Sequence, residues 1–190
     1  MFVDADGVLW SDTGPGAILR TKELSAHAHS FLGQVRSATE VKFKVIVVSN
    51  QTAVARGMTT EDEMVNLFDQ LLLKPRLVDA VLLCLCHPHA QDSRYRTNCR
   101  CRKPNPEMFL VAANRLMVDL KESVMIGDRI TDIVASSRAG ISRNYLLLND
   151  RSFELNFSED AVGDEDSTYF SVIRELSEVV LATPSEIDKD

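Results

Sequence analysis

Short apolar runs of strand length alternate along the chain with stretches of helical periodicity. The strand-like runs cover residues 2–3, 43–48, 80–85, 123–126 and 144–148. The helical stretches cover residues 21–32, 61–72, 105–117, 131–138 and 169–181. Alternation of this kind predicts an α/β fold, in which helices cover both faces of a parallel sheet.

Several of the predicted helices carry recognisable end signals. Thr60 and Glu63 form a capping box that opens the helix over 61–72. Asn105 is typical of an N-cap and Pro106 of a first helical position, which together predict a helix beginning there. Gly140 is expected to end the helix over 131–138.

The remaining segments complete a single domain over residues 1–190, since this length forms one core without needing a second. Residues 152–167 are acidic and weakly periodic, which predicts a surface loop, and 185–190 are expected to be a frayed tail. The first strand has only three residues before Asp4, so we expect the native chain to begin upstream of Met1.

Composition and charge exclude several partners. The chain is 45% hydrophobic but has no apolar run long enough for a membrane span, and no signal peptide is visible. Its net charge of −7 disfavours general binding to nucleic acid or anionic membranes. We therefore expect a cytoplasmic monomer. The dense basic stretch is either an anion-binding patch or a solvated loop: Arg94, Arg96, Arg100, Arg102 and Lys103.

Polar residues follow three of the predicted strands directly. Asp4, Ser49 and Asp128 each come after an apolar run. In open parallel sheets, ligands bind beyond the carboxyl ends of the strands. The sequence therefore predicts a site at this edge of the sheet.

The pair Asp4 and Asp6 suits acid–base and nucleophilic chemistry. Two carboxylates at this spacing lie on one side of an extended segment, so one can attack as a nucleophile while the other delivers a proton. Gly7 permits a tight turn directly afterwards, and a plain strand-end turn is the alternative interpretation. A calcium loop is disfavoured because its later acidic ligands are missing.

Three further segments add a cation site and phosphate contacts. Asp128 could hold a hard cation together with Asp4, whereas Asp132 could support that site or simply complement a helix dipole. Ser49 and Asn50 offer hydrogen-bond donors to phosphate oxygens. Lys103 offers a positive charge for a transferring phosphoryl group.

Together, residues 2–9, 45–50, 102–104 and 125–132 resemble motifs one to four of the haloacid dehalogenase superfamily of phosphohydrolases. Segments 49–57 and 99–108 are similar to heptose bisphosphate and histidinol-phosphate phosphatases in that superfamily. The resemblance covers about residues 2–148 and implies a three-layer Rossmann-like fold. The chain has no room for a separate cap domain.

The resemblance also implies roles for individual residues. Asp4 would be the nucleophile, and Asp6 the general acid and then the general base. Mg²⁺ would be held by Asp4, the backbone carbonyl of Asp6, and Asp128. Ser49 and Lys103 would hold the phosphoryl group. The residues expected to contact the substrate are Asn50, Gln51, Arg102 and Arg129, the last standing where the family often has lysine.

The four cysteines form two Cys-x-Cys pairs, Cys84 with Cys86 and Cys99 with Cys101. Without an export signal, such clustered thiols favour a metal over disulfides. The related phosphatases carry a zinc loop here, so the resemblance implies a structural Zn²⁺ in a loop over about 84–101. Cys86 replaces the family's histidine, which suggests four cysteine ligands, although His87 or His89 could replace one.

These features favour a Mg²⁺-dependent phosphatase for a small phosphorylated sugar of the heptose bisphosphate type. Residues 10–19 are expected to form a flexible substrate loop. The alternatives are histidinol phosphate or another phosphomonoester, a polynucleotide 3′-phosphate, or a non-catalytic zinc-stabilised binding domain on the same scaffold.

Overall fold

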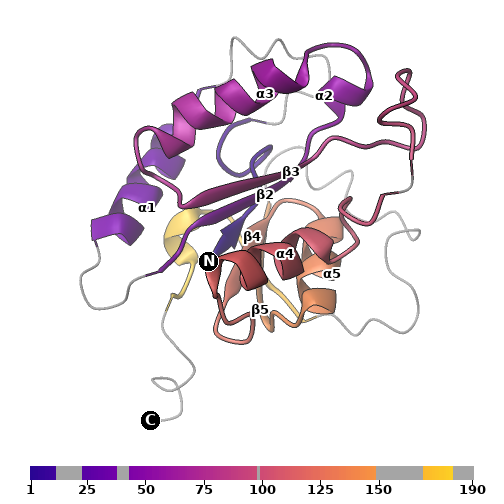
Figure 1. Cartoon of the computed structure of the whole chain (residues 1–190). Helices are drawn as coiled ribbons and strands as arrows, with labels where there is room; N and C mark the ends of the chain where they lie inside the picture. The colour runs from indigo at the N-terminus through magenta and orange to yellow at the C-terminus, as the bar shows by residue number, and fades with distance from the viewer. Residues whose placement is uncertain (12–22, 38–42, 98, 149–168, 182–190) are drawn as a thin grey trace, which may run out of the picture.

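A six-stranded parallel sheet forms the centre of the molecule, in the strand order β3-β2-β1-β4-β5-β6 (Figure 1). The structure is a computed structural model, and it describes residues 1–11, 23–37, 43–97, 99–148 and 169–181. The strands are β1 (Phe2–Val3), β2 (Ile46–Asn50), β3 (Ala80–Cys84), β4 (Val124–Gly127), β5 (Arg143–Leu147) and β6 (Ser171–Ile173). The predicted parallel sheet is therefore confirmed.

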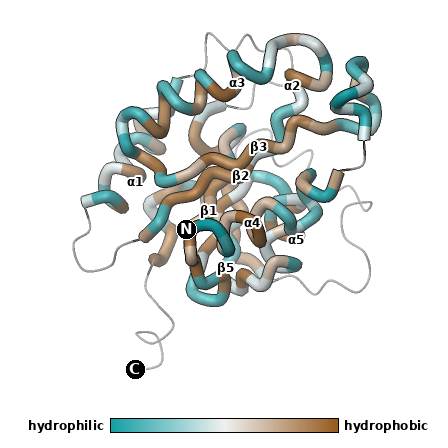
Figure 2. Tube along the Cα trace, viewed as in Figure 1, coloured by the Kyte–Doolittle hydropathy of each residue, from teal (hydrophilic) through white to brown (hydrophobic). Residues whose placement is uncertain are grey.

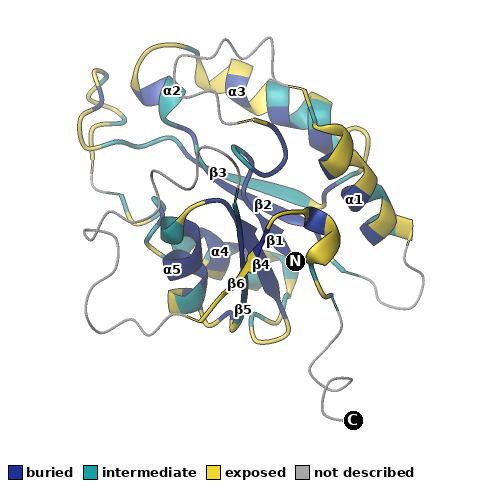
Figure 3. Cartoon of the chain, turned by 180° about the vertical axis from the view of Figure 1, so that it is seen from behind, coloured by how far each residue is buried: buried dark blue, intermediate teal, exposed yellow. Residues whose placement is uncertain are grey.

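Helices cover both faces of this sheet. They are α1 (Ala26–Ser37), α2 (Thr52–Ala55), α3 (Glu61–Phe68) with its π-helical continuation η2 (Asp69–Leu73), α4 (Glu107–Leu116), α5 (Ile130–Ala139) and the 3₁₀ turn η4 (Leu176–Glu178). Helices α1 and α3 pack on one face and α4 and α5 on the other, which gives three layers. Figure 2 shows the apolar central strands, and Figure 3 shows β1, β2 and β4 buried between helices with exposed residues, whereas β3 at the sheet edge is mostly half-buried.

Strand alternation explains why the core has two halves. Successive residues of a strand point to opposite faces of the sheet. Val47 accordingly packs in the cluster under α1 and α3, whereas Ile46 and Val48 pack in the cluster under α4 and α5. Both faces of β2 are fully buried, as expected for a parallel strand covered on two sides.

Two of the predicted helix ends are confirmed. The Thr60 side chain accepts a hydrogen bond from the Glu63 amide, and the Glu63 carboxylate accepts one from the Thr60 amide, at 3.2 and 3.1 Å. Gly140 ends α5 with a left-handed φ of 100°.

Other predicted boundaries are wrong. Residues 169–181 do not form a helix: they form edge strand β6 and the turn η4, because Ile173 pairs with Leu147 of β5. Asn105 is not the N-cap of α4; Pro106 takes that place, and the Asn105 side-chain nitrogen donates to the Cys99 carbonyl at 3.3 Å. The predicted acidic loop over 152–167 and the tail over 185–190 lie outside the described residues.

No helix in the described ranges combines the length and the apolar character that a membrane crossing requires.

Candidate active site at the carboxyl edge of the sheet

Three neighbouring strands deliver polar side chains to one edge of the sheet. Asp4 follows β1, Ser49 lies near the end of β2, and Asp128 follows β4. β1 pairs with β2 on one side and with β4 on the other, with Val3 opposite Val47 and Ile126. The three polar residues that follow therefore lie at the same edge of the sheet. The Asp4 amide also donates to the Ile126 carbonyl at 2.9 Å. The expected convergence at this edge is observed.

Lys103 reaches the same place from the loop before α4. Its ammonium lies 2.9 Å from Asp4 Oδ1 and 2.6 Å from Asp132 Oδ1, and it donates to the Val48 carbonyl at 2.8 Å. The side chain is 2% exposed. Burial opposes its charge, but the Asp132 and Asp4 carboxylates outweigh burial and raise the pKa of Lys103. The lysine is therefore held as a buried cation.

The Asn50 side chain fixes the backbone at Lys103. Its amide nitrogen donates to the Lys103 carbonyl at 3.1 Å, and its amide oxygen accepts from the Lys103 amide at 3.1 Å. This two-point contact ties β2 to the loop before α4. Asn50 was expected to contact substrate; in the structure its side chain clamps the loop that carries the lysine.

Asp4, Asp128 and Asp132 form a buried group in which one carboxylate oxygen from each lies within 4.8 Å of the others. Burial first, and then the Asp132 charge, raises the pKa of Asp4 to about 6. Burial, Asp132 and Asp4 raise the pKa of Asp128 to about 8. Three carboxylates share this site with one ammonium, which contacts Asp4 and Asp132, so the group has the charge and the oxygen ligands that suit a hard divalent cation such as Mg²⁺.

Asp132 belongs to this site through two contacts. One carboxylate oxygen meets Lys103, and the other accepts a hydrogen bond from the Arg129 amide at 3.0 Å. The residue is 1% exposed. From the sequence, Asp132 could either complement the helix dipole or support the site. The structure contains both contacts, one at the start of α5 and one with Lys103, because α5 begins at the edge of the sheet.

Asp6 lies beside the buried carboxylates but is held by other partners. Its Oδ1 accepts a hydrogen bond from the Trp10 indole nitrogen at 2.7 Å, and its Oδ2 accepts one from the Gln51 side-chain nitrogen at 2.8 Å. The same Gln51 nitrogen donates to Ser49 Oγ at 3.0 Å. The expected flexible loop over 10–19 is wrong for Trp10, which is 3% exposed; residues 12–19 lie outside the described ranges.

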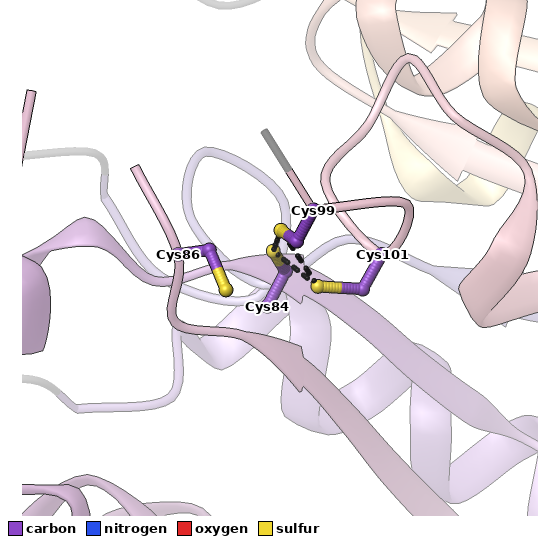
Figure 4. Close-up of side chains that lie close together, drawn as sticks. All are labelled: Cys84, Cys86, Cys99 and Cys101. Atoms are coloured by element: carbon purple, nitrogen blue, oxygen red, sulfur yellow. Dashed lines mark hydrogen bonds between the residues drawn. The ribbon is translucent and has the colours of Figure 1, made fainter. Parts of the chain in front are cut away.

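The four cysteines converge in a second cluster near the end of β3 (Figure 4). Sulfur separations are 2.7 Å for Cys84–Cys101, 3.0 Å for Cys99–Cys101 and 3.3 Å for Cys84–Cys99, and all four lie within 4.8 Å of one another. Sulfurs stand about 3.8 Å apart around a tetrahedral Zn²⁺, so these three pairs would separate by about 0.5–1.1 Å to hold one.

The chemistry of the cysteine cluster also fits a cation. Burial and the neighbouring thiols Cys99 and Cys101 raise the pKa of Cys86 to about 12, so ionising it needs a compensating positive charge. His87 and His89, the alternative ligands suggested by the sequence, do not belong to the cluster of ligand atoms found among the described residues. Instead, His87 Nδ1 accepts a hydrogen bond from the His89 amide at 3.1 Å.

Comparison with known proteins places these features in a family. A family model described as HAD-hydrolase-like matches residues 100–149. D-glycero-β-D-manno-heptose-1,7-bisphosphate 7-phosphatase of Yersinia pestis is 32% identical over 77% of this chain and 79% of its own length. The corresponding α-anomer enzyme of Burkholderia mallei is 33% identical over 77% and 78%.

The chain belongs to the haloacid dehalogenase (HAD) superfamily of phosphohydrolases. Among solved structures, D,D-heptose 1,7-bisphosphate phosphatase from B. bronchiseptica, complexed with magnesium and phosphate, has the same fold. The match has a TM-score of 0.70 and 24% identity, and it covers 93% of both chains. The expected HAD fold is thus confirmed.

The basic stretch of this HAD-family chain is divided among different tasks. Arg94 pairs with Asp92 at 2.7 Å, and Arg96 donates to the Ala90 carbonyl at 2.7 Å, so both stabilise their own loop. Arg102 donates to the Cys86 carbonyl at 3.3 Å, while Lys103 enters the buried site. Arg129, the other predicted substrate contact, is exposed at the start of α5.

Sequence reasoning missed the part that Trp10 plays at this site. Residue spacing gave no sign that its indole would meet Asp6, because the contact depends on how the chain turns after Gly7. The only available signal was the proximity of Trp10 to the Asp-x-Asp pair.

Proposed function

We propose that this chain is a Mg²⁺-dependent phosphatase that removes a phosphate from a small phosphorylated sugar. The observation that carries the proposal is the convergence of Asp4, Asp128 and the buried ammonium of Lys103 at the carboxyl edge of the sheet. Such a site combines a nucleophile with groups that balance the negative charge of a transferring phosphoryl group.

In the proposed reaction, an Asp4 carboxylate oxygen attacks phosphorus while the bond to the sugar oxygen breaks. Asp6 gives a proton to that leaving oxygen, which frees the sugar and leaves phosphate on Asp4. Asp6, now ionised, takes a proton from a water whose oxygen attacks the same phosphorus. Inorganic phosphate leaves, and both aspartates return to their starting states.

The remaining residues bind and orient. Lys103 and Ser49 hold phosphoryl oxygens, Asn50 keeps Lys103 in place, and Arg102 and Arg129 contact the rest of the substrate. Mg²⁺ would be held by Asp4, Asp128 and the backbone carbonyl of Asp6, with Asp132 supporting Lys103, and would neutralise charge on the phosphoryl oxygens.

We propose a heptose 1,7-bisphosphate as the substrate class. The support is the match to relatives named as 7-phosphatases of this sugar, which include enzymes for both anomers. We therefore assign no anomer. A cytoplasmic location goes with this proposal, because the four cysteines are free thiols and such clusters persist in reducing compartments.

We further propose a structural Zn²⁺ bound by Cys84, Cys86, Cys99 and Cys101. The support is the convergence of the four sulfurs, with neither histidine in the cluster. A closed four-sulfur site leaves no position for a reacting water, so its role would be to hold the loop that leads into Lys103.

The test is phosphate release from a panel of phosphate esters with Mg²⁺ present: both heptose bisphosphate anomers, histidinol phosphate, a 3′-phosphorylated oligonucleotide and 4-nitrophenyl phosphate. Asp4→Asn should reduce release by at least about a thousandfold. The matched control Asp119→Asn, at an exposed position, should leave release unchanged.

Two results would count against this proposal. Retained Mg²⁺-dependent release by Asp4→Asn would refute the nucleophile assignment. A wild-type protein inactive on the whole panel would refute the phosphatase function and favour a binding role for the scaffold.

A further inference from the structure

Both oxygens of the Asp6 carboxylate accept a hydrogen bond from a buried side chain. The Trp10 indole N–H donates to Oδ1 at 2.7 Å, and the Gln51 side-chain nitrogen donates to Oδ2 at 2.8 Å. A carboxylate rotates in a broad, roughly two-fold well when nothing holds it. Donors on both oxygens remove that freedom and set the plane of the carboxylate.

Trp10 is itself fixed by the backbone and by the core. The Gly7 amide donates to the Trp10 carbonyl at 2.8 Å, which closes the turn after Asp6. The indole is buried and packs edge-on against Phe68 of α3, with ring centroids 5.2 Å apart and an interplanar angle of 65°. The direction of the indole N–H is therefore set by the fold.

Gln51 is fixed in the same way from the neighbouring strand. Its backbone amide donates to the Cys84 carbonyl at 2.8 Å, and its side chain is buried. The side-chain nitrogen that meets Asp6 also donates to Ser49 Oγ at 3.0 Å. One amide group thus joins Asp6 to the hydroxyl that the proposed function assigns to the phosphoryl group.

We propose that Trp10 and Gln51 are positioning residues, which aim the Asp6 carboxyl group at the oxygen of the leaving group. This inference rests on the proposed function, in which Asp6 gives that oxygen its proton as the bond to phosphorus breaks. Proton transfer requires hydrogen-bond reach, so an Asp6 side chain free to rotate spends less time in the productive position. A carboxylate oxygen has two lone-pair directions, so accepting one of these hydrogen bonds does not by itself block the proton transfer.

The experiment compares two leaving groups. A sugar alkoxide is a poor leaving group and needs the proton from Asp6, whereas 4-nitrophenolate leaves without one. Trp10→Phe removes the N–H and keeps an aromatic ring against Phe68. We expect it to lower kcat/KM about a hundredfold on the sugar phosphate and less than about threefold on 4-nitrophenyl phosphate.

kcat/KM is the right quantity because it covers the steps up to release of the first product. Hydrolysis of the aspartyl-phosphate, which is common to both substrates, does not enter it. Gln51→Met removes the second donor at similar length. Because Gln51 also donates to Ser49, this variant should lower kcat/KM on both substrates, but more on the sugar phosphate. It also tests the inference if Trp10→Phe does not fold.

Two controls separate positioning from general damage. Phe109→Leu disturbs the core cluster under α4 and α5 without touching Trp10, and it should leave the ratio between the two substrates unchanged. In an Asp6→Asn background, Trp10→Phe should cause no further loss on the sugar phosphate, because the group that it positions is gone.

An equal loss on both substrates, or a further loss in the Asp6→Asn background, would overturn the inference. Failure of the proposed function looks different: the wild-type protein would then release phosphate from neither substrate.

Discussion

At the scale of single residues, Gly7 lies directly against the Asp128 carboxylate of the acidic site. It adopts a left-handed φ of 83°, and a Cβ built on it would overlap the Asp128 carboxylate. Gly7→Ala should therefore displace that carboxylate and abolish stabilisation by Mg²⁺. We expect phosphatase activity to fall about a hundredfold or more, since small displacements of reacting groups are this costly. Isothermal titration with Mg²⁺ and a phosphate-release assay measure both effects.

Gly140 offers the matched control. It also has a left-handed φ, 100°, but nothing lies within 4 Å of an added Cβ. Gly140→Ala should cost about 1–2 kcal/mol of stability, from backbone strain alone, and keep Mg²⁺ binding and activity. If both variants bound Mg²⁺ normally, the close approach of Gly7 to Asp128 would not matter for the site.

The residue scale also shows what the sequence could predict. Asp4, Asp128 and Lys103 were expected at one site because each stands at a strand end or a motif with known chemistry. The contact of Asp132 with Lys103 needed the position of α5 relative to the loop before α4, which no local pattern contains. Trp10 was misassigned to a flexible loop because its burial depends on the distant Phe68.

At the scale of elements, local signals predicted best where they did not compete with tertiary contacts. The capping box at Thr60 gave the first residue of α3 correctly. The predicted helix over 169–181 was wrong, although its periodicity is helical, because β5 offers an edge that pairs with Ser171–Ile173. Strand pairing with a distant segment overrides a modest helical preference.

The loop from β3 to α4 is the element that joins the cysteine cluster to the acidic site. Cys101 lies two residues before Lys103, and the Arg102 side chain donates to the Cys86 carbonyl. Cys99→Ser should remove the proposed Zn²⁺ site, lower the melting temperature, and reduce kcat about a hundredfold by displacing Lys103. Metal analysis, thermal unfolding and phosphate release on the same preparation measure these effects.

Ser93→Ala, at an exposed position in the same loop, is the control and should change none of these quantities. A Cys99→Ser protein that lost zinc but kept full kcat would show that the loop holds Lys103 without metal. That result would leave Asn50 as the main tie between β2 and the lysine.

At the scale of the whole molecule, the parallel sheet concentrates negative charge where its central strands end. Without a cation, the folded protein holds protons on Asp128 and Asp4 more tightly than the unfolded chain, since their pKa values rise from 3.8 to about 8 and about 6. The free energy of unfolding of the magnesium-free protein should therefore receive its full contribution from these groups below about pH 4. It should lose that contribution as the pH rises toward 8.

Mg²⁺ should reverse this loss, because it binds the ionised carboxylates. Thermal unfolding with and without Mg²⁺ should show little stabilisation near pH 5 and a large one near pH 8.5, about 2.7 kcal/mol when Mg²⁺ is a hundredfold above its Kd. Asp128→Asn removes the group with the higher pKa and should flatten both the pH dependence and the response to Mg²⁺. An equal response at the two pH values would mean that the cation does not bind at these carboxylates, since binding there has to compete with their protons.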